Sequence, residues 1–343
     1  MTDVQAPASA RCFHCGMSLH LSVLNQGQWV HDDQWAWESD PHPVMLAPEK
    51  IVVPDFYRDD RGTKRSIKLD EQGVPRDQWG RPVIRRADGT WRGYSRISSI
   101  AKELDAGIGL TYWKTAMTAI GITITPDLFV QVARLVDEAV SDPYTENRST
   151  LIKLAEKAQE AAGSTIKREL GTTLHEWAAI WDRTHDLDLI PAEHRADIEA
   201  YALALGRHHI GVLENEVFVV VDDIEIAGSL DKLLQFQAPT GRVVLGDLKT
   251  GQVEPQYPMN VEMQVAGYVH GERYDLLSHE RSSLHPDIDL DEGMLIHLPS
   301  RSGTCEIYPL NLKRGWQNLM LATDLKRARR ESGRRLKPLE SAA

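Results

Sequence analysis

Cysteine is scarce in this sequence, and its scarcity excludes one class of fold. The 343 residues contain only three cysteines, Cys12, Cys15 and Cys305. A framework of disulfide bonds needs several cysteines, usually in an even number. The chain must therefore be held together by a hydrophobic core, and 343 residues are enough to bury one.

Long apolar runs are missing as well. No stretch approaches the roughly 20 apolar residues that a membrane-spanning helix needs. The first residues, MTDVQAPASARC, lack the basic segment followed by an apolar segment that marks a secretory signal. We therefore expect a cytoplasmic protein with no membrane partner.

Positive charge is in deficit overall, but it is unevenly spread. The chain has 39 Lys and Arg against 50 Asp and Glu, a formal net charge of −11. This total argues against nucleic acid as a partner, because phosphate binding needs positive surface. Two segments are basic although the chain as a whole is acidic: GRPVIRRADGTWRGYSR (80–96) and LKRARRESGRRLK (325–337).

The first basic segment interleaves arginine with tryptophan. Arg85, Arg86 and Arg92 are suited to phosphate oxygens, and Trp91 can stack on an unpaired base. A solvated hairpin with surface arginines is the alternative. The second segment indicates a phosphate-binding arm, or else an end of the chain that is merely soluble.

The order of the predicted elements indicates an α/β protein. Apolar periodicity predicts two helices within residues 146–184, three strands within 215–250 and a helix that begins near Pro258. We expect a mixed, mostly antiparallel central sheet flanked by helices, with no internal repeat. The predicted divisions are a small Cys/His-containing module (1–50), an extension with basic and aromatic loops and helices (51–145), the α/β core (146–310), and a C-terminal helix with a basic tail (311–343).

The stretch VVLGDLKTG, residues 243–251, begins as a buried strand and ends with an acid and an amine. Because side chains alternate along a strand, Leu245, Asp247 and Lys249 face the same way. Burying Asp247 and Lys249 is costly unless they are paired or bind something. An ordinary salt bridge at the end of a strand is the alternative, since Asp-x-Lys is a common pattern.

Two more side chains predict a metal site beside this pair. Asp231 lies in the preceding strand, within GSLDKLL, and pairing of the two strands would bring it to Asp247. Two neighbouring carboxylates repel each other unless they are protonated or bridged by a cation. Oxygen ligands suit Mg²⁺ or Mn²⁺, and His175 on the upstream helix would favour Mn²⁺. A packed histidine is the alternative for His175.

Gln264 and Tyr268 lie four residues apart on one face of the predicted helix after the strands. Both are candidates to reach the same pocket and hold Lys249 or a phosphate. The alternative places Tyr268 in the core and Gln264 on the surface.

Four motifs, GTTLH, GSLDKLL, GDLKTG and QVAGY, occur in an order and spacing that resembles the PD-(D/E)xK nuclease superfamily, its RecB-like branch above all. ENEVFV, before the Asp231 strand, is similar to that branch too. YSRISSIAKELDAGIGLTYWK resembles the start of exonucleases from phages of actinobacteria. The nuclease resemblance covers roughly residues 146–300, and the phage resemblance adds about residues 91–122. It implies a restriction-endonuclease-like core within residues 146–310.

The resemblance also implies the ligands of a divalent ion. His175, Asp231 and Asp247 would bind Mg²⁺ or Mn²⁺, with the Leu248 carbonyl as a further ligand. Several relatives hold an iron–sulfur cluster with four cysteines. This chain has three, so we expect no such cluster.

The remaining implied roles concern the water and the DNA. Lys249 would orient or activate the attacking water and offset charge on the phosphate. Gln264 and Tyr268 would steady Lys249 and the DNA. Arg168, on the same helical face as His175, would contact DNA as well.

We therefore expect a metal-dependent deoxyribonuclease that hydrolyses phosphodiester bonds, acting as an exonuclease in phage recombination or replication. Its partners would be DNA and a phage single-strand annealing or recombination protein, in the host cytoplasm if a phage encodes it. The alternative is a non-catalytic DNA-binding or adaptor protein on the same fold. The sequence does not separate exonuclease from endonuclease action.

The N-terminal RCFHCG contains Cys12-x-x-Cys15, which is half of a structural zinc site. His31 and His42 would complete a Cys₂His₂ set, with two further histidines, His14 and His20, as alternatives. Reduced thiols in an arm without zinc are the other interpretation.

Overall fold

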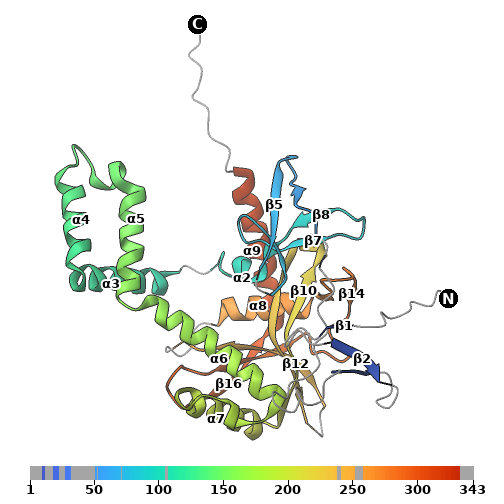
Figure 1. Cartoon of the computed structure of the whole chain (residues 1–343). Helices are drawn as coiled ribbons and strands as arrows, with labels where there is room; N and C mark the ends of the chain where they lie inside the picture. The colour runs from blue at the N-terminus through green and yellow to red at the C-terminus, as the bar shows by residue number, and fades with distance from the viewer. Residues whose placement is uncertain are drawn as a thin grey trace.

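The computed structural model describes residues 10–11, 18–22, 28–31, 51, 53–70, 72–104, 107–237, 241–251 and 258–332. Along these residues short strands come first, a run of helices follows, and the remaining strands are interrupted by one helix and followed by another (Figure 1). The helices are α2 (Ile97–Ala101), α3 (Ile108–Ile124), α4 (Pro126–Asp137), α5 (Pro143–Ala161), α6 (Ser164–Thr184), α7 (Ala192–Arg207), α8 (Met259–Val269) and α9 (Leu312–Ser332).

A mixed, mostly antiparallel sheet forms the centre of the molecule and confirms the predicted α/β arrangement. Its strands follow the order β14-β13-β10-β11-β12-β15-β16, and β9 pairs with β11 outside this path. The strands are β9 (Ser95–Arg96), β10 (Ile210–Val221), β11 (Ile226–Phe236), β12 (Val243–Lys249), β13 (Glu272–Tyr274), β14 (Arg281–Ser282), β15 (Glu292–His297) and β16 (Glu306–Asn311).

The strands β10 and β11 form a long antiparallel hairpin because both carry runs of β-branched and leucine side chains. A 3₁₀ turn, Asp222–Ile224, joins them, and Glu225 leaves it with a φ of 51°. The next strand, β12, is antiparallel to β11 and parallel to β15.

Each face of the sheet carries its own hydrophobic core. On the face covered by α8 and α9, Leu230 and Leu245 are buried with Val265 and Leu319. On the face covered by α6 and α7, Val244 is buried with Leu174 and other apolar side chains. Adjacent residues of β12 thus enter opposite cores, as its apolar alternation predicts.

The helices α3, α4 and α5 form an arm that projects from the sheet and joins it through α6 (Figure 1). The arm has a small core of its own, in which Leu128, Leu154 and Ala158 are buried. A Cβ added at Gly121 would lie 1.8 Å from the Ala158 carbonyl oxygen, so only glycine allows α3 and α5 to cross this closely.

No single helix among the described residues is long and apolar enough to cross a membrane. Together, α3 and α4 pass that test by length and composition, as a pair bent by 104°.

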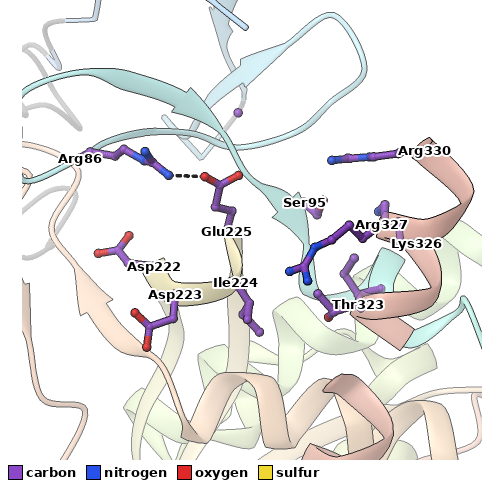
Figure 2. A pocket seen from close by; sticks show the side chains of 12 residues that line it. Arg86, Ser95, Asp222, Asp223, Ile224, Glu225, Thr323, Lys326, Arg327 and Arg330 are labelled. Carbon is purple, nitrogen blue, oxygen red and sulfur yellow. Dashed lines mark hydrogen bonds and ion pairs between the residues drawn. The ribbon is translucent and has the colours of Figure 1, made fainter. Parts of the chain in front are cut away.

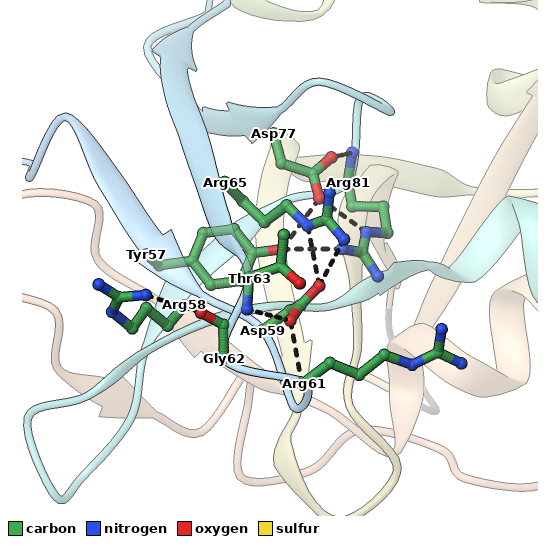
Figure 3. A network of polar contacts seen from close by, with 9 residues as sticks. All are labelled: Tyr57, Arg58, Asp59, Arg61, Gly62, Thr63, Arg65, Asp77 and Arg81. Carbon is green, nitrogen blue, oxygen red and sulfur yellow. Dashed lines mark hydrogen bonds and ion pairs between the residues drawn. The ribbon is translucent and has the colours of Figure 1, made fainter.

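Ahead of the arm, short antiparallel strands are joined by three turns of one design. In each turn, one oxygen of an aspartate accepts the N–H groups two and four residues later, and the other accepts an arginine Nε. Figure 3 shows two of these turns. The aspartate–arginine pairs are Asp59–Arg65, Asp70–Arg76 and Asp77–Arg81, and the strands are β4 (Phe56–Arg58), β5 (Lys64–Leu69), β6 (Pro75–Asp77), β7 (Val83–Arg85) and β8 (Trp91–Gly93).

The expectation of no internal repeat is therefore wrong for this region. Each turn also carries a glycine three residues after its aspartate, with φ values of 72°, 78° and 71° at Gly62, Gly73 and Gly80. The motif is short and its copies are unequally spaced, so it does not stand out in the sequence.

At the front of the chain, β1 (Ala10–Arg11), β2 (Ser18–Ser22) and β3 (Gln28–His31) form a three-stranded antiparallel sheet. The predicted zinc ligands Cys12, Cys15 and His42 lie outside the described residues, as does the side chain of His31. The zinc site therefore stays a prediction.

Candidate active site

The candidate site lies where β11 and β12 part. Their ladder ends at Lys232 and Gly246, and the next residues in the same register are Asp231 and Asp247. Beyond this point β12 pairs with β15. The Leu248 N–H donates to Asp231 Oδ2 at 2.9 Å and ties the two strands together. Both acids thus lie at the end of the ladder, as the predicted strand pairing requires.

Asp247 is the most enclosed member of the site, with 2% of its side chain exposed. Gln264 Nε2 donates to its Oδ1 at 3.1 Å. Its other oxygen, Oδ2, forms an ion pair with Lys249, whose Nζ lies 2.5 Å away. One carboxylate oxygen is held in place, and the other faces only a movable ammonium group.

Burial sets the charge balance of the site. It raises the pKa of Asp247 to about 6, against the opposing effect of Lys249, and it also raises the pKa of Asp231. For Lys249, burial works the other way, but Asp247 and Asp231 together raise its pKa. The single positive charge of Lys249 does not balance two carboxylates, so the site can bind a further cation once both acids are ionised.

His175 reaches the site from α6. Its Nδ1 lies 3.9 Å from Asp231 Oδ2. Burial, followed by the charge of Lys249, lowers its pKa, which favours the neutral imidazole with a free lone pair. One turn earlier, a Cβ at Gly171 would lie 2.7 Å from Thr250 Oγ1. Glycine at this position therefore lets α6 approach the end of β12.

A buried ion pair fixes α6 against β11, and sequence reasoning missed it. Lys232 Nζ donates to Asp182 Oδ2 at 2.5 Å and to Asn215 Oδ1 at 2.9 Å. The Tyr201 hydroxyl donates to the other oxygen of Asp182 at 2.9 Å. Asp182 lies two helical turns after His175. The sequence feature that could have indicated this ion pair is Lys232 itself, a lysine inside an apolar strand directly after Asp231.

Glu216 on β10 is a second missed residue. Burial dominates the pKa shifts of His175 and Asp231; the negative charge of Glu216 has a smaller effect, which adds to the raised pKa of Asp231 and opposes the lowered pKa of His175. Its φ is 55°, in the left-handed region that a glutamate rarely adopts within a strand. Glu216 is the second glutamate of ENEVFV, the segment before the Asp231 strand that already showed the nuclease resemblance.

Gln264 and Tyr268 both reach the site from α8, as predicted, and the prediction that they also hold a phosphate or the DNA stays a prediction. Gln264 contacts Asp247 and, at 3.4 Å, the Tyr268 hydroxyl, whereas we expected both residues to steady Lys249. A Cβ at Gly228 would lie 3.2 Å from the Tyr268 hydroxyl, so Tyr268 lies directly over β11.

Of the predicted DNA contacts, those between Arg85 and Arg92 lie away from the site. Arg86 and Arg92 both pair with Glu225, after the turn at the far end of β11. Trp91 is half-buried and lies edge-on to His279, with ring centroids 5.1 Å apart. Arg85 is exposed, and its backbone N–H donates to a tyrosine hydroxyl. The side chain of Arg168 is outside the described residues.

The predicted metal ligands are neighbours without forming a complete coordination shell. Within the described part of the chain, no three His, Cys, Asp or Glu side chains are close enough together to hold a metal ion. One imidazole and two carboxylates nonetheless suit Mn²⁺ or Mg²⁺. Asp247 Oδ2, which Gln264 does not contact, is the atom that fits such an ion best, provided that the Lys249 ammonium moves aside.

No protein-family model matches the sequence, and no curated protein matches it. Among solved structures, one named "Crystal structure of SSO0001" aligns at 15% identity over 58% of this chain and 86% of that chain, with a TM-score of 0.22. A similarity at this level carries no argument about fold or function.

Proposed function

We propose that this chain is a metal-dependent nuclease that hydrolyses phosphodiester bonds of DNA, with a restriction-endonuclease-like core in residues 146–310. One observation carries the proposal. His175, Asp231, Asp247, Lys249 and Gln264 come from four separate elements and meet where β11 and β12 part. A buried cluster of titratable groups with shifted pKa values costs stability, and such clusters concentrate at functional sites.

The residues divide the chemistry between them. His175, Asp231 and Asp247 would hold Mg²⁺ or Mn²⁺, with the Leu248 carbonyl beside them. When bound, the ion supplies a lowered pKa for water and neutralises charge on the phosphate. Gln264 keeps Asp247 Oδ1 occupied, so that Oδ2 is the oxygen left to face a ligand.

Lys249 acts through its charge. Its raised pKa keeps the ammonium protonated at neutral pH. Once displaced from Asp247, the ammonium lies beside the scissile phosphate, where it offsets developing charge and orients the attacking water. Its side chain is 39% exposed, which leaves room for this movement.

The test uses purified full-length protein with Mg²⁺ or Mn²⁺ on end-labelled linear DNA and on closed circular DNA. We expect cleavage of the linear DNA, and an intact circle if the enzyme is an exonuclease. Asp247→Ala and Lys249→Ala should each lower the rate at least about 100-fold. Lys313→Ala is the matched control, because Lys313 is exposed and pairs with Asp291 at the surface.

Intact linear DNA after long incubation of folded protein with Mn²⁺ would reject the nuclease proposal. If that protein still binds DNA, and Asp247→Ala binds equally well, the non-catalytic DNA-binding alternative holds. A role in phage recombination, with a single-strand annealing protein as partner, is part of the proposal. Co-purification of the two proteins from infected cells would test that partnership.

A further inference from the structure

A polar pocket lies at the start of β11, about five residues before Asp231 of the candidate active site (Figure 2). Its volume is about 300 Å³. The turn between β10 and β11 forms one wall and α9 forms the other, with Ser95 of β9 between them. Because Ser95 pairs with Ile226, the pocket is tied to the start of β11.

The α9 wall is a stripe of donors. Thr323, Lys326, Arg327 and Arg330 line the pocket at the spacing of one helical face. In Figure 2, Arg327 and Lys326 lie on the side of α9 that faces Ser95. This face therefore presents three cations and a hydroxyl to one small volume.

These cations are only weakly compensated. Lys326 lies 3.9 Å from Glu103, and Arg327 meets Asp324 at 3.3 Å where both side chains are well exposed. Arg330 has no ion-pair partner within the described residues. Burial, followed by the charge of Arg330, lowers the pKa of Lys326. Like charges held together in this way favour an anionic ligand.

The acids on the opposite wall are largely occupied. Glu225 pairs with both Arg86 and Arg92, and Asp222 pairs with Arg281. Asp223 remains as an exposed acid on this wall, against the three cations of the α9 stripe.

We propose that this pocket binds a phosphate group of the DNA strand, about five nucleotides from the scissile bond. Ile226 and Asp231 are five residues apart on β11, and about 3.3 Å per residue gives a separation of about 17 Å. A DNA strand rises about 3.4 Å per nucleotide, which gives the figure of about five. The inference rests on the proposed function, because DNA is the ligand there.

Binding is measured in EDTA, so that cleavage plays no part. The variant is Lys326→Gln with Arg330→Gln, and the probe is a labelled 12-nucleotide single strand. Loss of the one phosphate contact should reduce the slope of log K against log salt by about 0.7, which weakens binding about 5-fold at 0.1 M salt.

The control carries the same change of charge outside the pocket. Lys313→Gln with Arg329→Gln removes two exposed α9 cations that pair with Asp291 and Glu103. We expect this control to bind DNA within about 2-fold of the wild type. The pocket is rejected if both double variants weaken binding equally, or if neither does.

Two further arms separate the alternatives. Inorganic pyrophosphate at low millimolar concentration should displace the 12-nucleotide strand from the wild type but not from the pocket variant, which would show that the pocket binds phosphate. Absence of competition by pyrophosphate, together with unchanged salt slopes, would reject the pocket.

Asp223 is exposed on the pocket wall, and its negative charge should weaken DNA binding. Asp223→Asn should therefore bind DNA more tightly than the wild type. Altered slopes in a protein that never cuts DNA would keep the pocket and reject the nuclease, whereas cleavage with unchanged slopes would do the reverse.

Discussion

Asp77 shows how much one side chain can organise in this protein. Its side chain is fully buried, and it accepts hydrogen bonds from the N–H groups of Trp79 and Arg81, from Arg81 Nε and from the Tyr57 hydroxyl. Asp70 makes the corresponding turn, but its side chain is 29% exposed and has no tyrosine partner. The two positions share a motif and differ in burial.

We therefore predict unequal costs for the same substitution. Asp77→Ala strands buried donors and should lower the free energy of unfolding by about 3 kcal/mol, against about 1 kcal/mol for Asp70→Ala. Urea denaturation measures both. Burial raises the pKa of Tyr57 to about 12, with Arg81 lowering it and Asp77 raising it. Asp77→Ala should therefore lower the pH at which Tyr57 ionises, and equal losses of stability at the two positions would contradict the argument.

The acid that the proposed nuclease needs most is also one that the fold tolerates poorly. In the folded protein the pKa of Asp247 rises from 3.8 to about 6. Protonation of Asp247 in the folded protein contributes its full stabilisation below pH 3.8, the pKa of the unfolded state. This stabilisation is lost as the pH rises through about 6, the pKa of the folded state. Asparagine does not ionise and escapes this loss.

Asp247→Asn should accordingly stabilise the metal-free protein at pH 8 by up to about 3 kcal/mol, and change little at pH 4. Urea denaturation in EDTA at the two pH values makes the comparison. The same variant should lose DNA cleavage. A stability difference that does not depend on pH would mean that burial of this carboxylate is not the cause.

Among the elements, the contact of α6 with β11 depends on a pair of opposite charges. Lys232 and Asp182 are both buried and come from elements far apart in the sequence. Removing one partner leaves the other charge without compensation, which typically costs about 3–5 kcal/mol, whereas replacing both with apolar residues costs much less.

Lys232→Met should therefore destabilise the protein by about 3–5 kcal/mol, and Lys232→Met with Asp182→Leu should recover most of that loss. A double-mutant cycle measured by urea denaturation gives the coupling energy. Additive losses would show that the two charges do not act as a pair.

The hairpin of β10 and β11, the strand β12 and the helix α8 could be predicted because their signals are local. Runs of β-branched residues, turn residues between them and a proline at the start of the helix are each visible within a few positions. The same holds for Asp231 and Asp247, whose meeting follows from strand pairing alone.

The partners of charged side chains could not be predicted in this way. Lys232 pairs with Asp182, which lies 50 residues earlier in the sequence. Gln264 donates to Asp247 and not to Lys249, which has no acceptor atom in its side chain. Both outcomes depend on how closely helices lie against the sheet, which is decided by packing and not by periodicity. The ion pairs of Arg86 and Arg92 with Glu225 could not be predicted for the same reason.

At the scale of the whole molecule, the arm of α3, α4 and α5 is attached to the sheet without sharing its cores. Its buried residues Leu128, Leu154 and Ala158 form a cluster separate from those on the two faces of the sheet. In α3, only Met117 and Gly121 are buried. A unit with so little core is expected to open at a lower free energy than the rest.

Gly121→Ala tests whether the arm unfolds independently. The added Cβ would lie 1.8 Å from the Ala158 carbonyl oxygen, so α3 and α5 must separate. We predict faster amide hydrogen exchange throughout α3–α5, while β10, β11 and β12 keep their protection because their cores are separate. Gly109→Ala is the matched control, since the same helix has open space there and alanine should favour it by about 1 kcal/mol. Equal loss of protection in the arm and in the sheet of the Gly121 variant would show that the molecule unfolds as one unit.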